Sequence, residues 1–203
     1  MKKYITEFIG TFFLVLTVGL TSGANALAIG SALMVMIYAG GHISGAHYNP
    51  AVTLAALIRK RISAMDALIY MGSQLLGGVI AAMIVMFFRE DIPSEASQGI
   101  VVSKALVAEV LGTFALAYVV LNVATAKANA GNSYFGLAIG FTVMVMAFAL
   151  GQYSGGAFNP AVAVGASVMK AFEWSNIWIY FVGCFGGGAL AGLAFNALNP
   201  GDK

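Results

Sequence analysis

The stretch that decides the fold occurs twice, first as Ser44-Gly45-Ala46-His47-Tyr48-Asn49-Pro50-Ala51-Val52 and again as Ser154-Gly155-Gly156-Ala157-Phe158-Asn159-Pro160-Ala161-Val162. The two copies occupy corresponding places in two halves of a very apolar chain, and 110 residues separate Asn49 from Asn159. In a membrane protein, a segment interrupted by glycine and proline that recurs in both halves indicates where a substrate path runs. We therefore expect the two copies to lie at the functional site.

The composition of the chain predicts an integral membrane protein. Of its 203 residues, 60% are hydrophobic and only 9% are charged, so its outer surface must face something other than water. A span needs roughly 20 apolar residues, and six stretches approach this length: 5–20, 27–41, 67–88, 106–123, 134–150 and 177–198. The predicted fold class is an all-α membrane protein with six transmembrane helices.

Two further apolar stretches, 49–58 and 159–169, are too short to span the bilayer. At about 1.5 Å per residue they reach roughly half of the hydrocarbon thickness. We interpret them as two re-entrant half-helices, each preceded by non-helical backbone such as residues 40–45. Backbone of that kind is tolerated at membrane depth only where it is buried in protein or lines water.

The duplication extends beyond this phrase. The segment Glu7-Phe8-Ile9-Gly10-Thr11-Phe12 returns as Glu109-Val110-Leu111-Gly112-Thr113-Phe114, which indicates a repeat of about a hundred residues. Each half carries three spans, so the second half must enter the membrane from the opposite side. The chain is therefore interpreted as one domain, 1–203, with a first inverted repeat at 1–90, an extracellular linker at 91–104 and a second inverted repeat at 105–203.

The positive charges predict the orientation. Cytoplasmic termini would place seven basic residues inside and three outside, which satisfies the positive-inside bias; the inner set is Lys2, Lys3, Arg59, Lys60, Arg61, Lys127 and Lys203. We expect a multi-pass protein of the cell membrane with both termini in the cytoplasm. No basic cluster is large enough to indicate nucleic acid, and the run at 59–61 is better explained by contact with the lipid bilayer.

The repeated phrase has a physical meaning of its own. Asn49 and Asn159 are suited to cap a helix whose first residue is Pro50 or Pro160. Two helix N-termini that face each other would present partial positive charge at the bilayer centre and repel cations. Each asparagine amide also offers two N–H donors. The expected permeant species is a small uncharged molecule that accepts hydrogen bonds.

These motifs resemble the major intrinsic proteins, the aquaporin and aquaglyceroporin channels. The resemblance covers almost the whole chain and implies a single channel domain that conducts water, with some permeability to small neutral solutes. It also implies a homotetramer with one pore per protomer. The motif residues at the centre of each pore would be Asn49, Pro50, Ala51, Asn159, Pro160 and Ala161.

The selectivity filter is where the chain departs from that family. Members usually carry an arginine directly after the second Asn-Pro-Ala, where this chain has Val162. The usual spacing implies that the other filter residues are Ile29, Ala147 and Gly156, and a shift of one residue would replace Ala147 by Phe148. A filter without charge or aromatic ring predicts weak discrimination between water and other small neutral solutes.

Four polar residues are expected to support or line the pore. Glu7 and Glu109 could each accept hydrogen bonds from the re-entrant loop of its own half, or could lie at helix starts near the headgroups, where negative charge suits the helix dipole. The resemblance implies that His42 lines the cytoplasmic half of the pore, and His47 is expected to brace the loop. Neither histidine has the partners of a metal site, so no metal and no cofactor are predicted.

Other functions were weighed against a water channel. The alternative within the family is a facilitator mainly for glycerol, urea, ammonia or another small uncharged solute. A coupled secondary transporter also fits inverted repeats, but it would need more ionisable groups at the midplane than the chain offers. An enzyme is not expected, because the repeated phrases contain no nucleophile–base set and no cofactor loop.

Overall fold

The structure of the chain, a computed structural model, describes residues 1–23, 25–90, 92 and 99–202, and the regular elements among these residues are all helices. Six helices in this part are long and apolar enough to cross a membrane: α1 (Lys2–Leu20), α2 (Ala26–Ser44), α4 (Ala64–Phe88), α5 (Val102–Thr125), α6 (Phe135–Ser154) and α8 (Ile177–Leu198). Single 3-10 turns, η1 (Lys127–Asn129) and η2 (Trp174–Asn176), precede α6 and α8. The six predicted spans are confirmed. Lys203 and most of the predicted linker at 91–104 lie outside the described residues.

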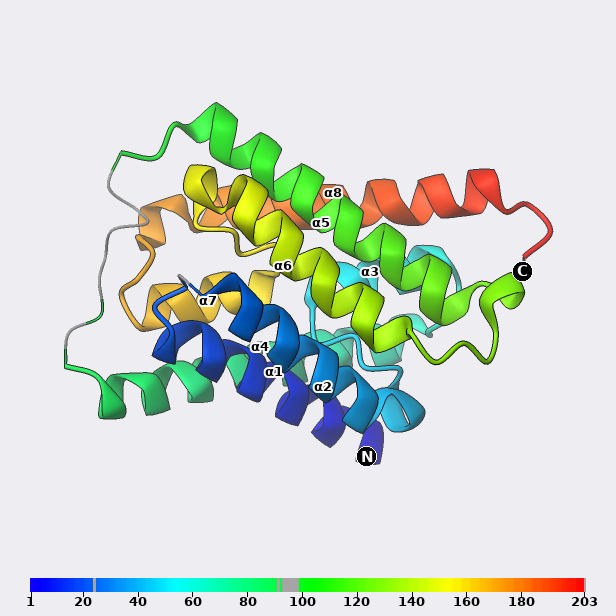
Figure 1. Cartoon of the computed structure of the whole chain (residues 1–203), viewed down its shortest axis with the longest axis horizontal. Helices are drawn as coiled ribbons and strands as arrows, with labels where there is room; N and C mark the ends of the chain where they lie inside the picture. The colour runs from blue at the N-terminus through cyan, green and yellow to red at the C-terminus, as the bar shows by residue number, and fades with distance from the viewer. Residues whose placement is uncertain (24, 91, 93–98, 203) are drawn as a thin grey trace.

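Two short helices, α3 (Pro50–Ile58) and α7 (Pro160–Val168), have nine residues each. At about 1.5 Å per residue each is roughly 14 Å long, about half of the hydrocarbon core. Figure 1 shows them starting near the middle of the molecule and running towards opposite ends. The prediction of two re-entrant half-helices is therefore confirmed.

The ends of α2 and α6 differ from the prediction. Residues 40–44 were expected to be non-helical, but α2 continues to Ser44, and α6 continues to Ser154 in the same way. Each helix ends one residue later at a glycine in the left-handed region, Gly45 at φ 85° and Gly155 at φ 84°. Glycine adopts this conformation without a Cβ penalty and so terminates the helix. Consequently the loops that enter the half-helices, 45–49 and 155–159, are only five residues long.

The two halves are packed into each other rather than side by side. Within each half the first and last long helices pair, α1 with α4 and α5 with α8, whereas α3 packs against α8 and α7 against α4. These crossings require glycine. A Cβ on Gly78 would lie 2.7 Å from the carbonyl oxygen of Ala161, and one on Gly188 would lie 2.4 Å from that of Ala51. Small residues that let helices approach closely are typical of membrane helix interfaces.

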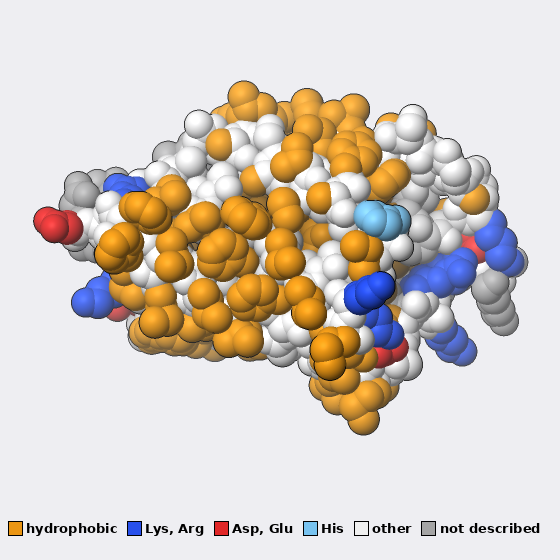
Figure 2. Space-filling model, turned by 90° about the horizontal axis from the view of Figure 1, so that it is seen from below, with side chains coloured by type: hydrophobic (Ala, Val, Ile, Leu, Met, Phe, Trp, Pro, Cys, Tyr) orange, Lys and Arg blue, Asp and Glu red, His pale blue; other side chains and the backbone are white. Residues whose placement is uncertain are grey.

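The surface agrees with a membrane environment. Figure 2 shows a broad band of hydrophobic side chains, with the charged side chains gathered towards the two ends of the molecule. In Figure 1 both termini lie at one end, and the end of α4 and the start of α5 lie at the other. The chain is a multi-pass membrane protein.

Candidate functional site

The loops that lead into the half-helices are held by two buried carboxylates. Glu7 on α1 is completely buried and accepts hydrogen bonds from Ser44 Oγ at 2.6 Å, from the backbone N–H of His47 at 3.0 Å and from that of Tyr48 at 2.7 Å. These partners satisfy loop N–H groups that would otherwise be buried without an acceptor. The headgroup position considered for this residue does not match its complete burial.

Glu109 on α5 repeats this arrangement in the second half. It is completely buried and accepts hydrogen bonds from Ser154 Oγ at 2.7 Å and from the N–H groups of Ala157 and Phe158 at 3.0 and 2.7 Å. The loop backbone is unusual, because Phe158 has a φ of 47° and its counterpart Tyr48 a φ of 49°. Non-glycine residues in this region are strained and need support from the surroundings.

The fourth partner differs between the two carboxylates. Gln74 on α4 donates from Nε2 to Glu7 Oε2 at 2.8 Å, and the corresponding contact in the second half is from Cys184 Sγ on α8 to Glu109 Oε2 at 3.3 Å. Cys184 is buried and not part of a disulfide. A thiol is a weaker donor than an amide, so Glu109 is the less firmly held of the two.

The two asparagines connect the half-helices to each other. Asn49 Oδ1 caps α3 by accepting from Ala51 N at 2.8 Å, and Asn159 Oδ1 caps α7 by accepting from Ala161 N at 2.9 Å. Each amide nitrogen then donates to a carbonyl of the other half, Asn49 to Phe158 O at 2.8 Å and Asn159 to Tyr48 O at 2.9 Å. One N–H of each amide is thus used within the protein, and the second can be offered to a solute.

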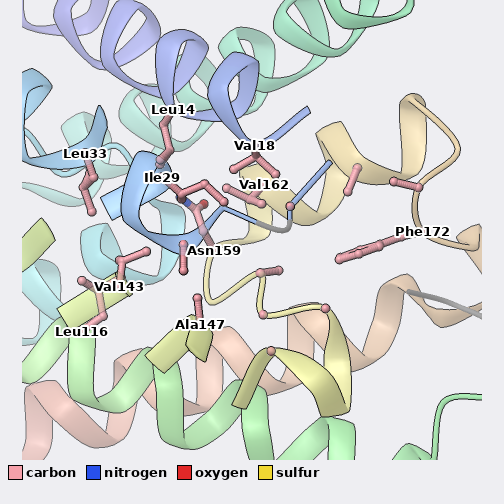
Figure 3. A pocket seen from close by; sticks show the side chains of 18 of the residues that line it. Leu14, Val18, Ile29, Leu33, Leu116, Val143, Ala147, Asn159, Val162 and Phe172 are labelled. Carbon is pink, nitrogen blue, oxygen red and sulfur yellow. The ribbon is translucent and has the colours of Figure 1, made fainter. Parts of the chain in front are cut away.

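These asparagines face a cavity of about 710 Å³. All four predicted filter residues also line this cavity: Ile29, Ala147, Gly156 and Val162. Figure 3 shows Ile29, Ala147 and Val162 around the same space as Asn159. Phe148 lines the cavity as well, although its side chain is 67% exposed. Apolar side chains from α1, α2, α5 and α6 form much of the remaining wall, among them Leu14, Val18, Leu33, Leu116 and Val143.

The two histidines differ in their surroundings. His42 is in the last helical turn of α2, is exposed, and lines neither of the two cavities described here. The prediction that it lies in an unwound loop is wrong, because the helix ends only after Ser44, and its role in lining the pore stays a prediction. His47 lies in the loop, lines the larger cavity, and its Nδ1 is 3.1 Å from Thr53 Oγ1.

A second, smaller cavity of about 250 Å³ lies beyond His47. Its wall includes Ser44 and Gly45 from the end of α2, Arg61 from the segment after α3, and Thr125 from the end of α5. Arg61 Nη2 donates to the carbonyl of Thr125 at 3.1 Å. Within the described residues, no group of three or more His, Cys, Asp or Glu side chains could hold a metal ion.

The same paired loops and asparagines are features of a known family, and the comparison is direct: residues 1–195 match the major intrinsic proteins. The chain belongs to this family. It is 34% identical over 222 residues to the probable aquaporin NIP4-2 of Arabidopsis thaliana, covering 100% of this chain and 76% of that one. It is 35% identical over 222 residues to the glycerol uptake facilitator protein-like 6 of Lactiplantibacillus plantarum, covering 100% of both.

A solved structure of another major intrinsic protein has the same fold. The X-ray structure of the aquaglyceroporin from Plasmodium falciparum superposes with a TM-score of 0.84 at 22% sequence identity, covering 96% of this chain and 95% of that one. Aquaporin TIP1-1 of Arabidopsis thaliana is 39% identical over 181 residues, which are 87% of this chain and 71% of that one. The aquaporin-like fold predicted from the sequence is therefore confirmed.

Several residues that build this site were not predicted from the sequence. Ser44 and Ser154 donate to the two carboxylates, and Gln74 supports Glu7. A signal was present, because Ser44 and Ser154 keep the same spacing of 110 residues as the two asparagines. Gln74 is a lone amide within an apolar span, where a polar side chain indicates a specific partner.

Proposed function

We propose that this major intrinsic protein is a passive channel through which water and small uncharged solutes cross the membrane. The observation that carries the proposal is the pair Asn49 and Asn159, fixed at two opposed helix N-termini and facing the large cavity. A solute that loses its hydration there can accept the remaining N–H of each amide. The positive ends of the two half-helices repel cations and protons at the same point.

The selectivity filter in this proposal consists of Ile29, Ala147, Gly156 and Val162. These side chains carry no charge and no aromatic ring, and the cavity continues past all four. Val162 offers no hydrogen bond at the position where most members carry an arginine. We therefore propose that the channel passes other small neutral solutes in addition to water.

A second candidate function is a facilitator whose main solute is glycerol, urea or ammonia. The uncharged filter favours it, and one relative is named a glycerol uptake facilitator-like protein. The substitution Val162→Arg would narrow this ring and add donors for water, so it is expected to lower glycerol and urea uptake several-fold and to preserve water flux. Equal glycerol uptake by the variant and the wild type would contradict this role of Val162.

The charged groups near the pathway do not favour ion-coupled transport. Glu7 and Glu109 are both occupied by loop N–H groups and by a serine hydroxyl. A coupling ion at the midplane would need an ionisable group free to bind it. Major intrinsic proteins are channels, and we assign this chain no enzymatic activity and no cofactor.

The proposed arrangement in the membrane follows the positive charges and the fold. Residues 1–90 and 105–203 form two inverted repeats, and the linker 91–104 lies outside the cell, with both termini in the cytoplasm. The location is the cell membrane, and the assembly is a homotetramer in which each chain holds its own pore. Water, small neutral solutes and the lipid bilayer are the partners, and nucleic acid is not one of them.

The proposal is tested by reconstitution. Purified protein in lipid vesicles should raise the rate of osmotic shrinkage in stopped-flow light scattering well above that of protein-free vesicles, and it should raise urea or glycerol uptake in the same preparation. Proton flux should stay at the level of protein-free vesicles. Water permeability equal to that of protein-free vesicles would contradict the proposed function.

A further inference from the structure

Two cavities of the structure meet at shared residues. His47 and Val120 line both the cavity of about 710 Å³ and the cavity of about 250 Å³. The larger space reaches from the linker end of the molecule, past the outer ring of Val162, Gly156 and Ala147, to the asparagine pair. The boundary between the two cavities therefore lies on the far side of Asn49 and Asn159 from that ring.

His47 is fixed on its side of this boundary. Its ring lies 5.3 Å from that of Tyr70 in an edge-to-face arrangement, and its backbone N–H is bound by Glu7. Tyr70 is itself anchored, because its hydroxyl donates to the carbonyl of Ser44 at 2.8 Å. The imidazole can therefore not turn away from the pathway without breaking this set of contacts.

The two ring nitrogens of His47 have different neighbours. Nδ1 is 3.1 Å from Thr53 Oγ1, and that hydroxyl is also 3.0 Å from the carbonyl oxygen of Asn49 and from Gln74 Nε2. The other nitrogen, Nε2, lies beside Gly45, which lines the smaller cavity.

Val120 is the apolar residue that, like His47, lines both cavities. It lies on α5 and is 7% exposed. A β-branched side chain in a helix has one strongly preferred χ1 rotamer, so its two methyl groups cannot swing aside. The outer ring differs in that Gly156 and Ala147 are the smallest side chains available, and the cavity passes them without interruption.

We propose that the aperture between His47 and Val120, rather than the outer ring, sets the size limit for solutes in this channel. This inference rests on the proposed function and adds the place in the channel at which solutes are selected by size. The aperture accepts a small neutral molecule that forms a hydrogen bond with His47 Nε2 and lays its C–H side along Val120. Water, urea and short linear polyols fit this description, and branched or cyclic solutes do not.

The test compares solutes of increasing size in reconstituted vesicles. Uptake of urea, glycerol and the four-carbon polyol erythritol is measured for the wild type, for Val120→Ala, and for the control Val143→Ala, which removes the same atoms from the wall of the larger cavity. Val120→Ala should raise the ratio of erythritol to urea uptake at least three-fold. Val143→Ala and Val162→Ala should leave this ratio within two-fold of the wild type.

A second variant keeps the test informative if Val120→Ala does not fold. Val120→Ile keeps the β-branched shape of the side chain and adds one methylene at the aperture, so it should lower glycerol uptake more than water flux. Unchanged solute ratios in both Val120 variants would contradict the proposed aperture. A ratio of erythritol to urea uptake that rises in Val162→Ala instead would contradict it as well. Wild-type vesicles no more permeable than protein-free vesicles would contradict the proposed function itself, and the aperture with it.

Discussion

The amide nitrogen of Asn49 donates a hydrogen bond of 2.8 Å to the backbone carbonyl of Phe158, 109 residues further along the chain. The reciprocal bond runs from Asn159 to the carbonyl of Tyr48 at 2.9 Å. Each asparagine therefore caps its own half-helix and at the same time fastens it to the loop of the other half. The two asparagines therefore join the two halves of the chain, in addition to the role in solute passage proposed for them.

Replacing either asparagine by alanine should weaken this joint. Asn49→Ala removes a helix cap, which is worth about 0.5–2 kcal/mol, together with the bond to Phe158. Asn159→Ala removes the corresponding pair of interactions, so the two variants should lower the thermal unfolding temperature in detergent by similar amounts. A loss of stability in only one of them would contradict the reciprocal arrangement.

Neutralising the buried carboxylates should have unequal effects. Glu7→Gln places an NH₂ group where two acceptor oxygens receive four donors, including the amide of Gln74. A buried polar group left without its partner costs about 1–3 kcal/mol. Glu109→Gln disturbs one fewer strong donor, because its fourth partner is the thiol of Cys184. Thermal unfolding should therefore show the larger loss for Glu7→Gln, and equal losses would contradict this reasoning.

The crossing of α4 and α7 should not tolerate a methyl group. In Gly78→Ala the new Cβ would lie 2.7 Å from the carbonyl oxygen of Ala161, and overpacking of this kind costs about 1–3 kcal/mol. Gly72→Ala is the matched control on the same helix, since a Cβ there has no neighbour within 4 Å. We expect folded yield and unfolding temperature to fall for Gly78→Ala alone. Similar behaviour of both variants would show that the contact with α7 is not what requires glycine.

The chain beyond α8 is held by a carboxylate. Asp202 accepts from the backbone N–H of Lys127 and from Arg59 Nη2, both at 2.9 Å. These interactions lower the pKa of Asp202 below its ordinary value, with the Lys127 N–H as the main cause. The stabilisation is therefore present above the unfolded pKa of about 3.9 and is lost as the pH falls through the lower folded value.

The variant Asp202→Asn makes this pH dependence measurable. Its unfolding temperature in detergent should lie below that of the wild type at pH 6, and the difference should begin to shrink as the pH falls below about 4, the pKa of the unfolded carboxyl, and go on shrinking towards the lower folded pKa. A difference that stays constant from pH 6 to pH 3 would show that the charge of Asp202 has no part in holding this segment.

The sequence was sufficient to predict the helices and the place of the site. Six apolar stretches gave the spans, and Asn49-Pro50 and Asn159-Pro160 gave the starts of both half-helices, because capping and φ restriction act locally. The carboxylates were also identified, since a charge inside an apolar span needs a partner. Each of these inferences depends on residues that are close in the sequence.

The errors concern details that tertiary contacts decide. The glycines at 40 and 41 suggested a broken helix, but α2 continues to Ser44 and ends at Gly45. That difference of one helical turn places His42 in a helix and leaves His47 in the loop, where it lines the larger cavity. The aperture proposed at His47 and Val120 joins two residues that are far apart in the sequence, which no local pattern reports.

The central claim is that water crosses through an open path at the two asparagines, and the temperature dependence of water permeability tests it most directly. In stopped-flow measurements on reconstituted vesicles, the activation energy should fall well below that of protein-free vesicles, because water in a pore does not have to dissolve in hydrocarbon. An activation energy equal to that of protein-free vesicles would contradict the account.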